Sequence, residues 1–204
     1  MVTTGILEEI GLAFCLGIIM KGADLCNEHK CHYFIGDKYV LGTLWGIIGI
    51  ILINNNCFLS TAIIALLLSY ILRAKIDYIN HGIGSTLILI YFLFNLHEKP
   101  ECFYYNRFIY LFAAFSITGL FHDIFPKLIE KFVKITNLAS SLIDNNTMTE
   151  IIHSLLNYIL IPLTFSFFWN EPSLVVCFSL FAIGYEVSRA LGPKFRKERI
   201  TTNV

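Results

Sequence analysis

Two short polar runs interrupt an otherwise apolar sequence, and both carry side chains that bind metals or transfer protons. The runs share the spacing Asp-x-x-Asn, and their residues are Asp24, Asn27, Asp77, Asn80 and His81. Residues three or four positions apart lie on one side of a helix, so each run presents its polar groups on one stripe. Carboxylate and amide oxygens suit Mg²⁺ or Mn²⁺, whereas a histidine nitrogen extends the choice to Zn²⁺. We therefore predict a divalent metal site, with Mg²⁺ or Mn²⁺ preferred over Zn²⁺, whose ligands are Asp24, Asn27 and Asp77.

Further polar residues follow other apolar segments and extend this set to acid–base and substrate-binding roles. Those expected to be catalytic are Asp77, His81, His122 and Asp123. Those expected to bind substrate are Lys21, Lys75, Asn80 and Arg189. Imidazole titrates near neutral pH and suits proton transfer, and basic side chains suit phosphate oxygens. A structural interpretation stays open for each residue, because Asp and Asn also cap helices and form turns, and Arg189 can pair with Glu186 three residues earlier.

The composition indicates the setting of these residues. Of 204 residues, 56% are hydrophobic and only 15% are charged, against about 25% charged in a soluble domain. The mean hydropathy is +0.67. Basic and acidic residues number 15 each, so no excess of positive charge points to a nucleic acid. These values exclude a disordered chain, a nucleic-acid binder and an ordinary soluble enzyme.

Apolar segments long enough to cross a bilayer recur along the chain. The hydrocarbon core is about 30 Å thick and requires about 20 mostly apolar residues in a helix. Six segments meet or nearly meet this length: 39–54, 58–74, 82–96, 107–121, 151–169 and 173–191. A seventh, 6–20, is the weakest, because it is short and begins beside Glu8 and Glu9. We predict an all-α fold, a polytopic membrane helix bundle of six or seven spans that forms one domain over residues 1–204.

Two polar segments lie outside the predicted spans. In 122–150, apolar residues recur at helical spacing with lysines on another face, which predicts an amphipathic helix on the cytoplasmic surface followed by a loop. The basic tail 192–204 is expected to contact anionic lipid headgroups. Either segment would also suit the docking of a protein partner.

The distribution of Lys and Arg predicts the orientation in the membrane. If the spans alternate and the C-terminus is cytoplasmic, 13 of the 15 basic residues lie inside, and Lys99 and Arg107 lie outside. We therefore predict an integral membrane protein with a cytoplasmic C-terminus and an outside N-terminus, in the plasma membrane or the endoplasmic reticulum. No cleavable signal peptide is evident in the first residues.

Cysteines and glycines carry weaker signals. Cys57 and Cys102 fall in predicted outside loops, where a disulfide is feasible in principle. The tract 26–32 holds two Cys and two His, which are zinc ligand types, but their spacing differs from that of a closed zinc finger. Gly42, Gly46 and Gly49 form a smooth strip that predicts the close approach of a second helix.

One motif resembles a family signature. The run Lys75-x-Asp77-x-x-x-His81-Gly82 is similar, over about ten residues, to the Lys-Asp…His-Gly-Gly signature of CDP-diacylglycerol synthases. The basic pairs and the closing Asp-Arg…Asp of that signature are absent, and we assign no family on these residues.

The clustering of polar groups at one end of alternate helices favours an enzyme. We expect a transferase or hydrolase that acts on a membrane lipid or a lipid-linked phosphate at the cytoplasmic face. A membrane transporter is an alternative, although few ionisable residues lie deep in the predicted spans. A non-catalytic membrane subunit that docks a partner is a third interpretation.

Overall fold

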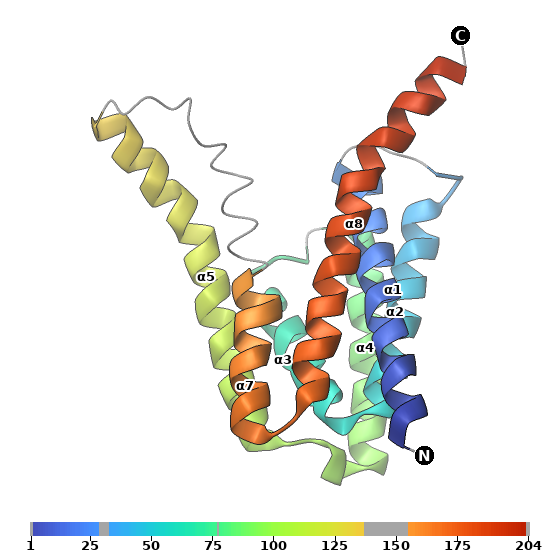
Figure 1. The fold of residues 1–204 in the computed structure, drawn as a ribbon, viewed down its shortest axis with the longest axis vertical. Helices are drawn as coiled ribbons and strands as arrows, with labels where there is room; N and C mark the ends of the chain where they lie inside the picture. The colour runs from blue at the N-terminus through green and yellow to red at the C-terminus, as the bar shows by residue number, and fades with distance from the viewer. Residues whose placement is uncertain (1, 29–32, 77, 137–154, 203–204) are drawn as a thin grey trace.

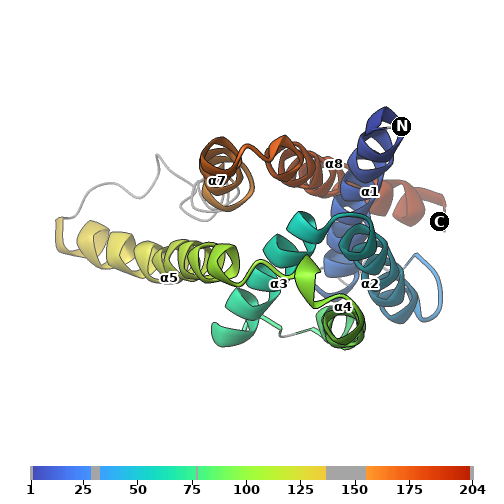
Figure 2. The ribbon, with the colours of Figure 1, turned by 90° about the horizontal axis from the view of Figure 1, so that it is seen from below.

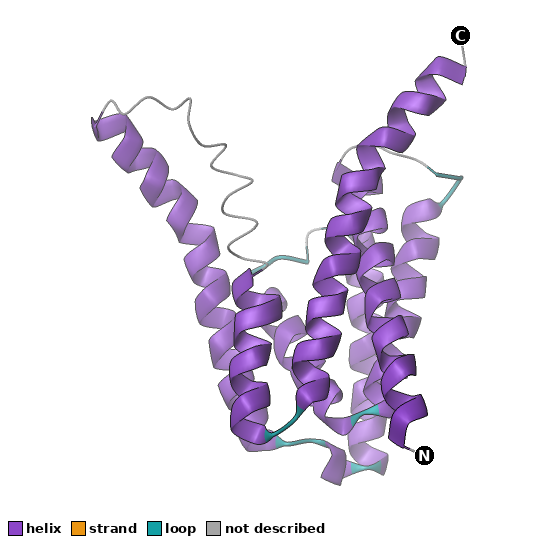
Figure 3. Cartoon of the chain, in the orientation of Figure 1, coloured by secondary structure: helices purple, strands orange, loops and turns teal. Residues whose placement is uncertain are grey.

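The computed structural model describes residues 2–28, 33–76, 78–136 and 155–202 (Figure 1). In these ranges the regular structure is helical throughout, without a β-strand (Figure 3). The helices are α1 (Val2–Glu28), α2 (Asp37–Asn55), α3 (Cys57–Leu72), α4 (Ile79–Glu98), α5 (Tyr105–Thr136), α7 (Ile161–Trp169) and α8 (Pro172–Thr202). Two short elements complete the set, the 3₁₀ turn η1 (Pro100–Cys102) and the π-helical turn η2 (Leu156–Leu160). The prediction of an all-α fold is confirmed.

Consecutive helices run in alternating directions along one axis (Figure 1). Helices α1, α3, α5 and α8 ascend in that view, and α2, α4 and α7 descend. We call the end where α1 and α3 finish and α4 begins the upper end, and the end where α2 turns into α3 the lower end. The N-terminus lies at the lower end and the C-terminus at the upper end. Alternation therefore gathers the polar runs that follow α1 and α3 at one end of the bundle.

Within the described ranges, three helical segments are long and apolar enough to cross a membrane, judged by length and composition. They are α2, α4 and the segment Pro172–Leu191 of α8. The segments Cys57–Leu72 and Leu156–Trp169 are apolar but shorter. The predicted spans coincide with helices, although the span at 151–169 begins in residues outside those described.

Helix α3 occupies the centre of the bundle (Figure 2). Its side chains are mainly apolar on every side, with the hydroxyls of Ser60, Thr61 and Ser69 buried among them, and Leu59, Ala62 and Ala65 are almost completely buried. A helix without a charged face is stable when other helices or lipid surround it. Residues Phe115 of α5 and Leu174 of α8 belong to the same buried cluster. The core therefore forms around α3, and the other helices pack outside it.

The helix that contains the fifth predicted span extends beyond that span, which was expected to end at residue 121. The sequence predicted an amphipathic helix in this segment, and residues 122–136 are helical as a direct continuation of α5. The helix continues through the polar pair at 122–123 although Pro126, one turn further on, has no backbone N–H to donate to the carbonyl of residue 122. The placement of this segment on a membrane surface stays a prediction, and residues 137–150 lie outside the described ranges. The basic tail likewise continues α8 as helix to Thr202.

Glycines let two pairs of helices approach closely. A side chain at Gly17 of α1 would collide with the backbone of Phe181, and one at Gly184 of α8 would collide with the backbone of Phe14. On the other side of the bundle, Gly42 packs against the backbone of Asn80. Gly46 and Gly49 extend that second contact along α4, as the glycine strip predicted. Helix α8 is therefore held close to α1, which carries the first polar run, and α4, which carries Asn80 and His81 of the second, is held close to α2.

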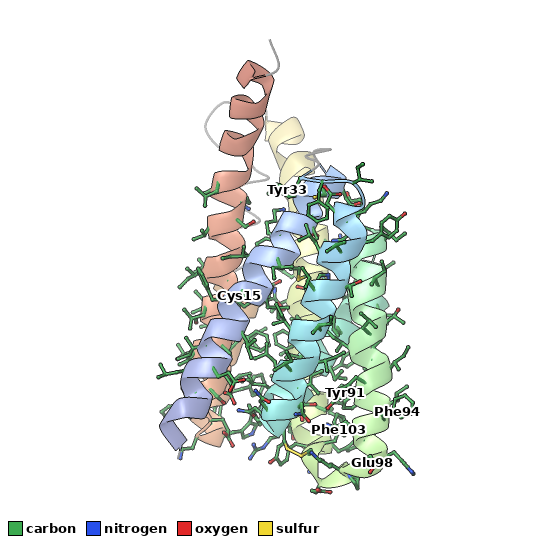
Figure 4. The ribbon with its side chains drawn as sticks, turned by 90° about the vertical axis from the view of Figure 1, so that its right-hand side faces the viewer. Cys15, Tyr33, Tyr91, Phe94, Glu98 and Phe103 are labelled. Atoms are coloured by element: carbon green, nitrogen blue, oxygen red, sulfur yellow. A yellow bond between two sulfur atoms is a disulfide. The ribbon has the colours of Figure 1, made fainter. Side chains whose placement is uncertain are left out.

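A disulfide closes the lower end of the bundle. Cys57, at the start of α3, is bonded to Cys102 in η1, with their Cα atoms 4.7 Å apart. Figure 4 shows this bond close to Phe103, at the opposite end from Tyr33. The pairing considered from the sequence is present, and it ties the α4–α5 connection to the central helix.

Candidate acid–base site

Asp24, in the last turn of α1, is the centre of a hydrogen-bonded cluster at the upper end. Its Oδ1 lies 2.6 Å from Nε2 of His81 and accepts a hydrogen bond from Nδ2 of Asn80 at 3.1 Å. Its Oδ2 accepts a hydrogen bond from the hydroxyl of Tyr185 at 3.1 Å. A carboxylate only accepts hydrogen bonds, so Nε2 of His81 carries the proton of that short contact. We call these four residues, together with Asn27, the Asp24 cluster.

Asn27 fixes the orientation of the amide that contacts Asp24. It lies one helical turn after Asp24 on the same stripe of α1, as the i, i+3 spacing predicts. Its Nδ2 donates to Oδ1 of Asn80 at 2.6 Å and to the carbonyl of Ala23 at 3.1 Å. With its oxygen engaged by Asn27, Asn80 points its NH₂ group at Asp24. The two polar runs therefore meet directly in space.

Local packing explains why these side chains meet. Asn80 and His81 lie in the first turn of α4, and the close contact of Gly42 with Asn80 holds that turn against α2. Tyr185 reaches Asp24 because Gly17 and Gly184 let α8 lie against α1. The geometry of the site thus depends on small residues located away from it.

The two partners of the short contact differ in exposure. The Asp24 side chain is 4% exposed, and the His81 side chain is 16% exposed. A buried carboxylate beside an imidazole fixes the ring tautomer and orientation and stabilises the protonated ring. The proton on Nε2 leaves Nδ1 as the basic nitrogen of the neutral ring. Nδ1 itself is buried in this structure, so the pair has the tautomer of an oriented general base, and its basic nitrogen reaches a substrate only after the side chains around it move.

A second cluster at the upper end joins α3 to α5, and we call it the Asp123 cluster. Asp123 Oδ1 lies 2.9 Å from Nζ of Lys75, and its Oδ2 lies 3.4 Å from a terminal nitrogen of Arg73. His81 follows Lys75 by only six positions along the chain. Catalytic and substrate-binding residues expected from the sequence therefore divide between two clusters at the same end.

Comparison of the chain with protein-family models, curated proteins and solved structures found no match. Function therefore has to be argued from the clusters themselves.

The remaining candidate residues have different outcomes. The ammonium of Lys21 lies 5.1 Å from the centre of the Tyr185 ring, beside the Asp24 cluster. Arg189 pairs with Glu186 at 3.2 Å on its own helix, which is the structural alternative considered from the sequence. Asp77 lies outside the described residues, and the description of His122 covers its backbone in α5 but not its side chain.

Two cluster members were missed by the sequence interpretation. Tyr185 lies inside an apolar segment, where an aromatic residue does not by itself indicate a polar site. The residues considered in that segment were the charged Glu186 and Arg189. Arg73 was counted for orientation, although it lies two residues before Lys75. In both cases the sequence offered one indication, which is that the missed residue lies within two positions of a polar residue that had been considered.

The expected metal ligands meet only in part. Among the described residues three donors bind the Asp24 carboxylate, and a cation would have to displace at least one of them. Among the residues that the structure describes, no group of three or more His, Cys, Asp or Glu side chains is arranged to hold a metal. Asp77 is not among those residues, and the metal site stays a prediction.

A third buried carboxylate has a structural explanation. Asp37, at the start of α2, accepts hydrogen bonds from the backbone N–H groups of Tyr33 at 2.7 Å and Lys38 at 2.8 Å. The thiol of Cys26 donates to the same carboxylate at 3.4 Å. These contacts close the turn that leads into α2, so burial of an acid at this end is not by itself a sign of chemistry.

Proposed function

We propose that this protein is a membrane enzyme in which His81, oriented by Asp24, acts as general acid and base on a lipid or a lipid-linked phosphate. The observation that carries the proposal is the 2.6 Å contact between a partly exposed imidazole and a buried carboxylate. Asn80 and Tyr185 support it, because Asn80 donates to the same oxygen of Asp24 as His81 and Tyr185 donates to the other oxygen, so that the carboxylate is held in place.

The proposed reaction is a transfer or a hydrolysis. The proposed step requires the side chains that bury Nδ1 of His81 to move aside. Nδ1 then accepts a proton from an attacking water or hydroxyl as that oxygen bonds to the carbonyl carbon or phosphorus of the substrate. Asp24 stabilises the imidazolium that forms. The imidazolium then returns the proton to the oxygen of the leaving group as its bond to the substrate breaks.

The membrane setting is part of the same proposal. We infer six or seven spans with the upper end cytoplasmic, which puts the Asp24 cluster at the level of lipid headgroups. Supporting this inference, large apolar side chains are exposed on the outward faces of α4, α5 and α7, where a soluble protein would expose polar groups. They include Leu93, Phe94, Ile117, Phe167 and Phe168. The disulfide at the lower end agrees with an oxidising compartment on that side.

A divalent metal remains an additional proposal. Asp24 and Asn27 would supply oxygen ligands, and Asp24 would have to exchange at least one present hydrogen bond for the cation. We place the acid–base pair first because its two partners are already in contact.

The test compares turnover by purified variants in detergent micelles. Wild type, His81→Gln and Asp24→Asn would be incubated with a membrane lipid extract and with lipid-linked phosphates, and products would be followed by mass spectrometry. We expect a product that both variants fail to form, and that the exposed lower-end variant Lys99→Gln forms normally. The proposal is wrong if His81→Gln yields the product at the wild-type rate.

One observation favours transport as a second candidate. Glu9 and Asp24 are both buried on α1. Between them on the same helix, Ala13, Leu16 and Met20 line an apolar cavity of about 70 Å³. Two acids separated by a dry segment are an arrangement expected of a closed ion or proton path.

Proteoliposomes test this second candidate directly. A proton gradient across vesicles that contain the wild-type protein would dissipate faster than in empty vesicles, and Glu9→Gln would restore the slow rate. Equal dissipation in empty and protein-containing vesicles would remove transport of protons.

A further inference from the structure

Two cations share one carboxylate in the Asp123 cluster. Arg73 is 3% exposed, Lys75 is 47% exposed, and Asp123 is 22% exposed. Both cations contact Asp123, so the three charges leave one positive charge in excess. A buried guanidinium beside a half-exposed ammonium is an arrangement that favours an added anion.

The guanidinium of Arg73 is held in place before any ligand arrives. Its charge lies 5.1 Å from the centre of the Tyr70 ring. On the other side it lies against α5 at Gly119, where any side chain would collide with it. Its Nε donates to the carbonyl of Ser69 at 3.3 Å. A fixed fork of N–H groups binds an oxyanion with little loss of side-chain entropy.

The hydrogen-bonding capacity of this guanidinium exceeds what the cluster uses. Arginine has five N–H donors. Within the described ranges, Arg73 donates to Ser69 at 3.3 Å and to Asp123 at 3.4 Å, and both bonds are long. Charge-assisted bonds of this kind ordinarily measure about 2.7–2.9 Å. The cluster therefore retains donors for another acceptor.

The backbone between the two cations adopts an unusual conformation. Ala74 has a φ of 53°, in the left-handed region that residues with a Cβ rarely occupy. This turn lets Arg73 and Lys75, two positions apart, both reach Asp123. Such strain persists where the surrounding structure enforces it, commonly at functional sites.

We propose that Arg73 and Lys75 form a binding site for a phosphate group at the upper end of the bundle. The phosphate belongs either to a lipid headgroup or to a soluble phosphate compound, since both present the same oxygens. Binding itself does not require turnover. Its use in holding a substrate near His81 rests on the proposed function.

The experiment measures thermal unfolding of the full chain in phosphatidylcholine nanodiscs by tryptophan fluorescence. Inorganic phosphate is titrated in one arm, and phosphatidic acid is included in the nanodiscs in the other. We expect the wild-type midpoint to rise in at least one arm. A rise with phosphate alone identifies a soluble ligand, a rise with phosphatidic acid alone identifies a lipid headgroup, and a rise with both supports recognition of the shared phosphate.

Variants of the two cations separate binding from general stability. Arg73→Lys keeps the charge but loses the fork, so the phosphate concentration for half of the shift should rise about tenfold. Lys75→Gln, at the more exposed position, should raise it about threefold and covers the case in which Arg73→Lys does not fold. Lys38→Gln is the control, because its ammonium lies over the Tyr39 ring and outside the Asp123 cluster. No shift in either arm, or equal responses of wild type, Arg73→Lys and Lys75→Gln, overturns the proposal.

His81→Gln separates this inference from the proposed function. The variant should keep the phosphate-induced shift while it loses turnover. Normal turnover of His81→Gln together with a shift that depends on Arg73 would reject the catalytic role and leave the phosphate site standing.

Discussion

Helix α1 carries a buried carboxylate near each end, and the two have different surroundings. At the lower end, Glu9 is 7% exposed, and both of its oxygens lie 3.3 Å from Nδ2 of Asn56. The oxygen of the same amide accepts hydrogen bonds from the N–H groups of Phe58 and Leu59 and so caps α3. At the upper end, Asp24 contacts the imidazole of His81. Glu9 therefore orients a helix cap, whereas Asp24 orients a group that can exchange a proton.

This difference shows which property of a buried acid indicates chemistry. Burial is common to Glu9, Asp24 and Asp37, so it does not distinguish them. The partners do: the amide beside Glu9 and the backbone N–H groups that bind Asp37 do not act as general bases, whereas an imidazole does. The predictions below test whether function separates the two ends as their partners do.

The largest expected effect is on turnover at the upper end. His81→Gln should reduce turnover about 10²- to 10⁴-fold, the range for removal of a general acid or base. Glu9→Gln should leave turnover within a few-fold of wild type, because its amide can still engage Asn56. Product formation by the two purified variants, normalised to folded protein, provides the measurement. If His81→Gln and Glu9→Gln lose turnover to a similar extent, Asp24 and Glu9 do not differ in function as proposed.

The next largest effect concerns the covalent link at the lower end. Replacement of both Cys57 and Cys102 by Ala should destabilise the fold by about 4 kcal/mol, because the disulfide closes a loop across a sequence separation of 45. The unfolding midpoint in detergent should fall, and turnover per folded molecule should not. A double variant that melts like wild type but has lost turnover would reverse the roles assigned to the two ends.

A smaller loss of stability is expected from the cap at the lower end. Asn56→Ala removes the cap of α3 and leaves Glu9 buried without its amide, which together should cost about 2 to 3 kcal/mol. The exposed neighbour Asn55 gives a matched control, since Asn55→Ala should change the unfolding midpoint little. Equal midpoints for the two alanine variants would show that the Glu9–Asn56 contact does not contribute.

Much of the fold could be predicted because hydropathy and helical length report directly on apolar helices. The segment predicted at 82–96 lies within α4 (Ile79–Glu98), and that predicted at 39–54 lies within α2 (Asp37–Asn55). The fifth span was expected at 107–121 and an amphipathic helix after it, and α5 runs through both as one helix to Thr136. Polar residues indicate where a helix meets water, but only local backbone hydrogen bonding decides where it ends.

The site was predictable only within each polar run. The i, i+3 spacing correctly put Asp24 and Asn27 on one stripe, because helical periodicity fixes such pairs. The contact between Asp24 and His81 joins residues 57 positions apart and depends on how α4 packs, through Gly42, against α2. No spacing rule relates residues on different helices, and so Tyr185 was not selected.

The smallest expected effect, on Tyr185, addresses the upper end most directly. Tyr185→Phe keeps the ring beside Lys21 and removes one of the three hydrogen bonds to Asp24, which should cost about 1.5 kcal/mol of stability. If the hydroxyl acts through Asp24, the variant should also shift the pH profile of turnover, because the carboxylate that stabilises the imidazolium has lost a donor. When Tyr185→Phe is added to Asp24→Asn, the double variant should be little less stable than Asp24→Asn alone, because the charged acceptor of the tyrosine hydroxyl is already absent. Additive losses in the double variant would mean that Tyr185 contributes by packing alone, and that the Asp24 cluster is defined by His81, Asn80 and Asn27.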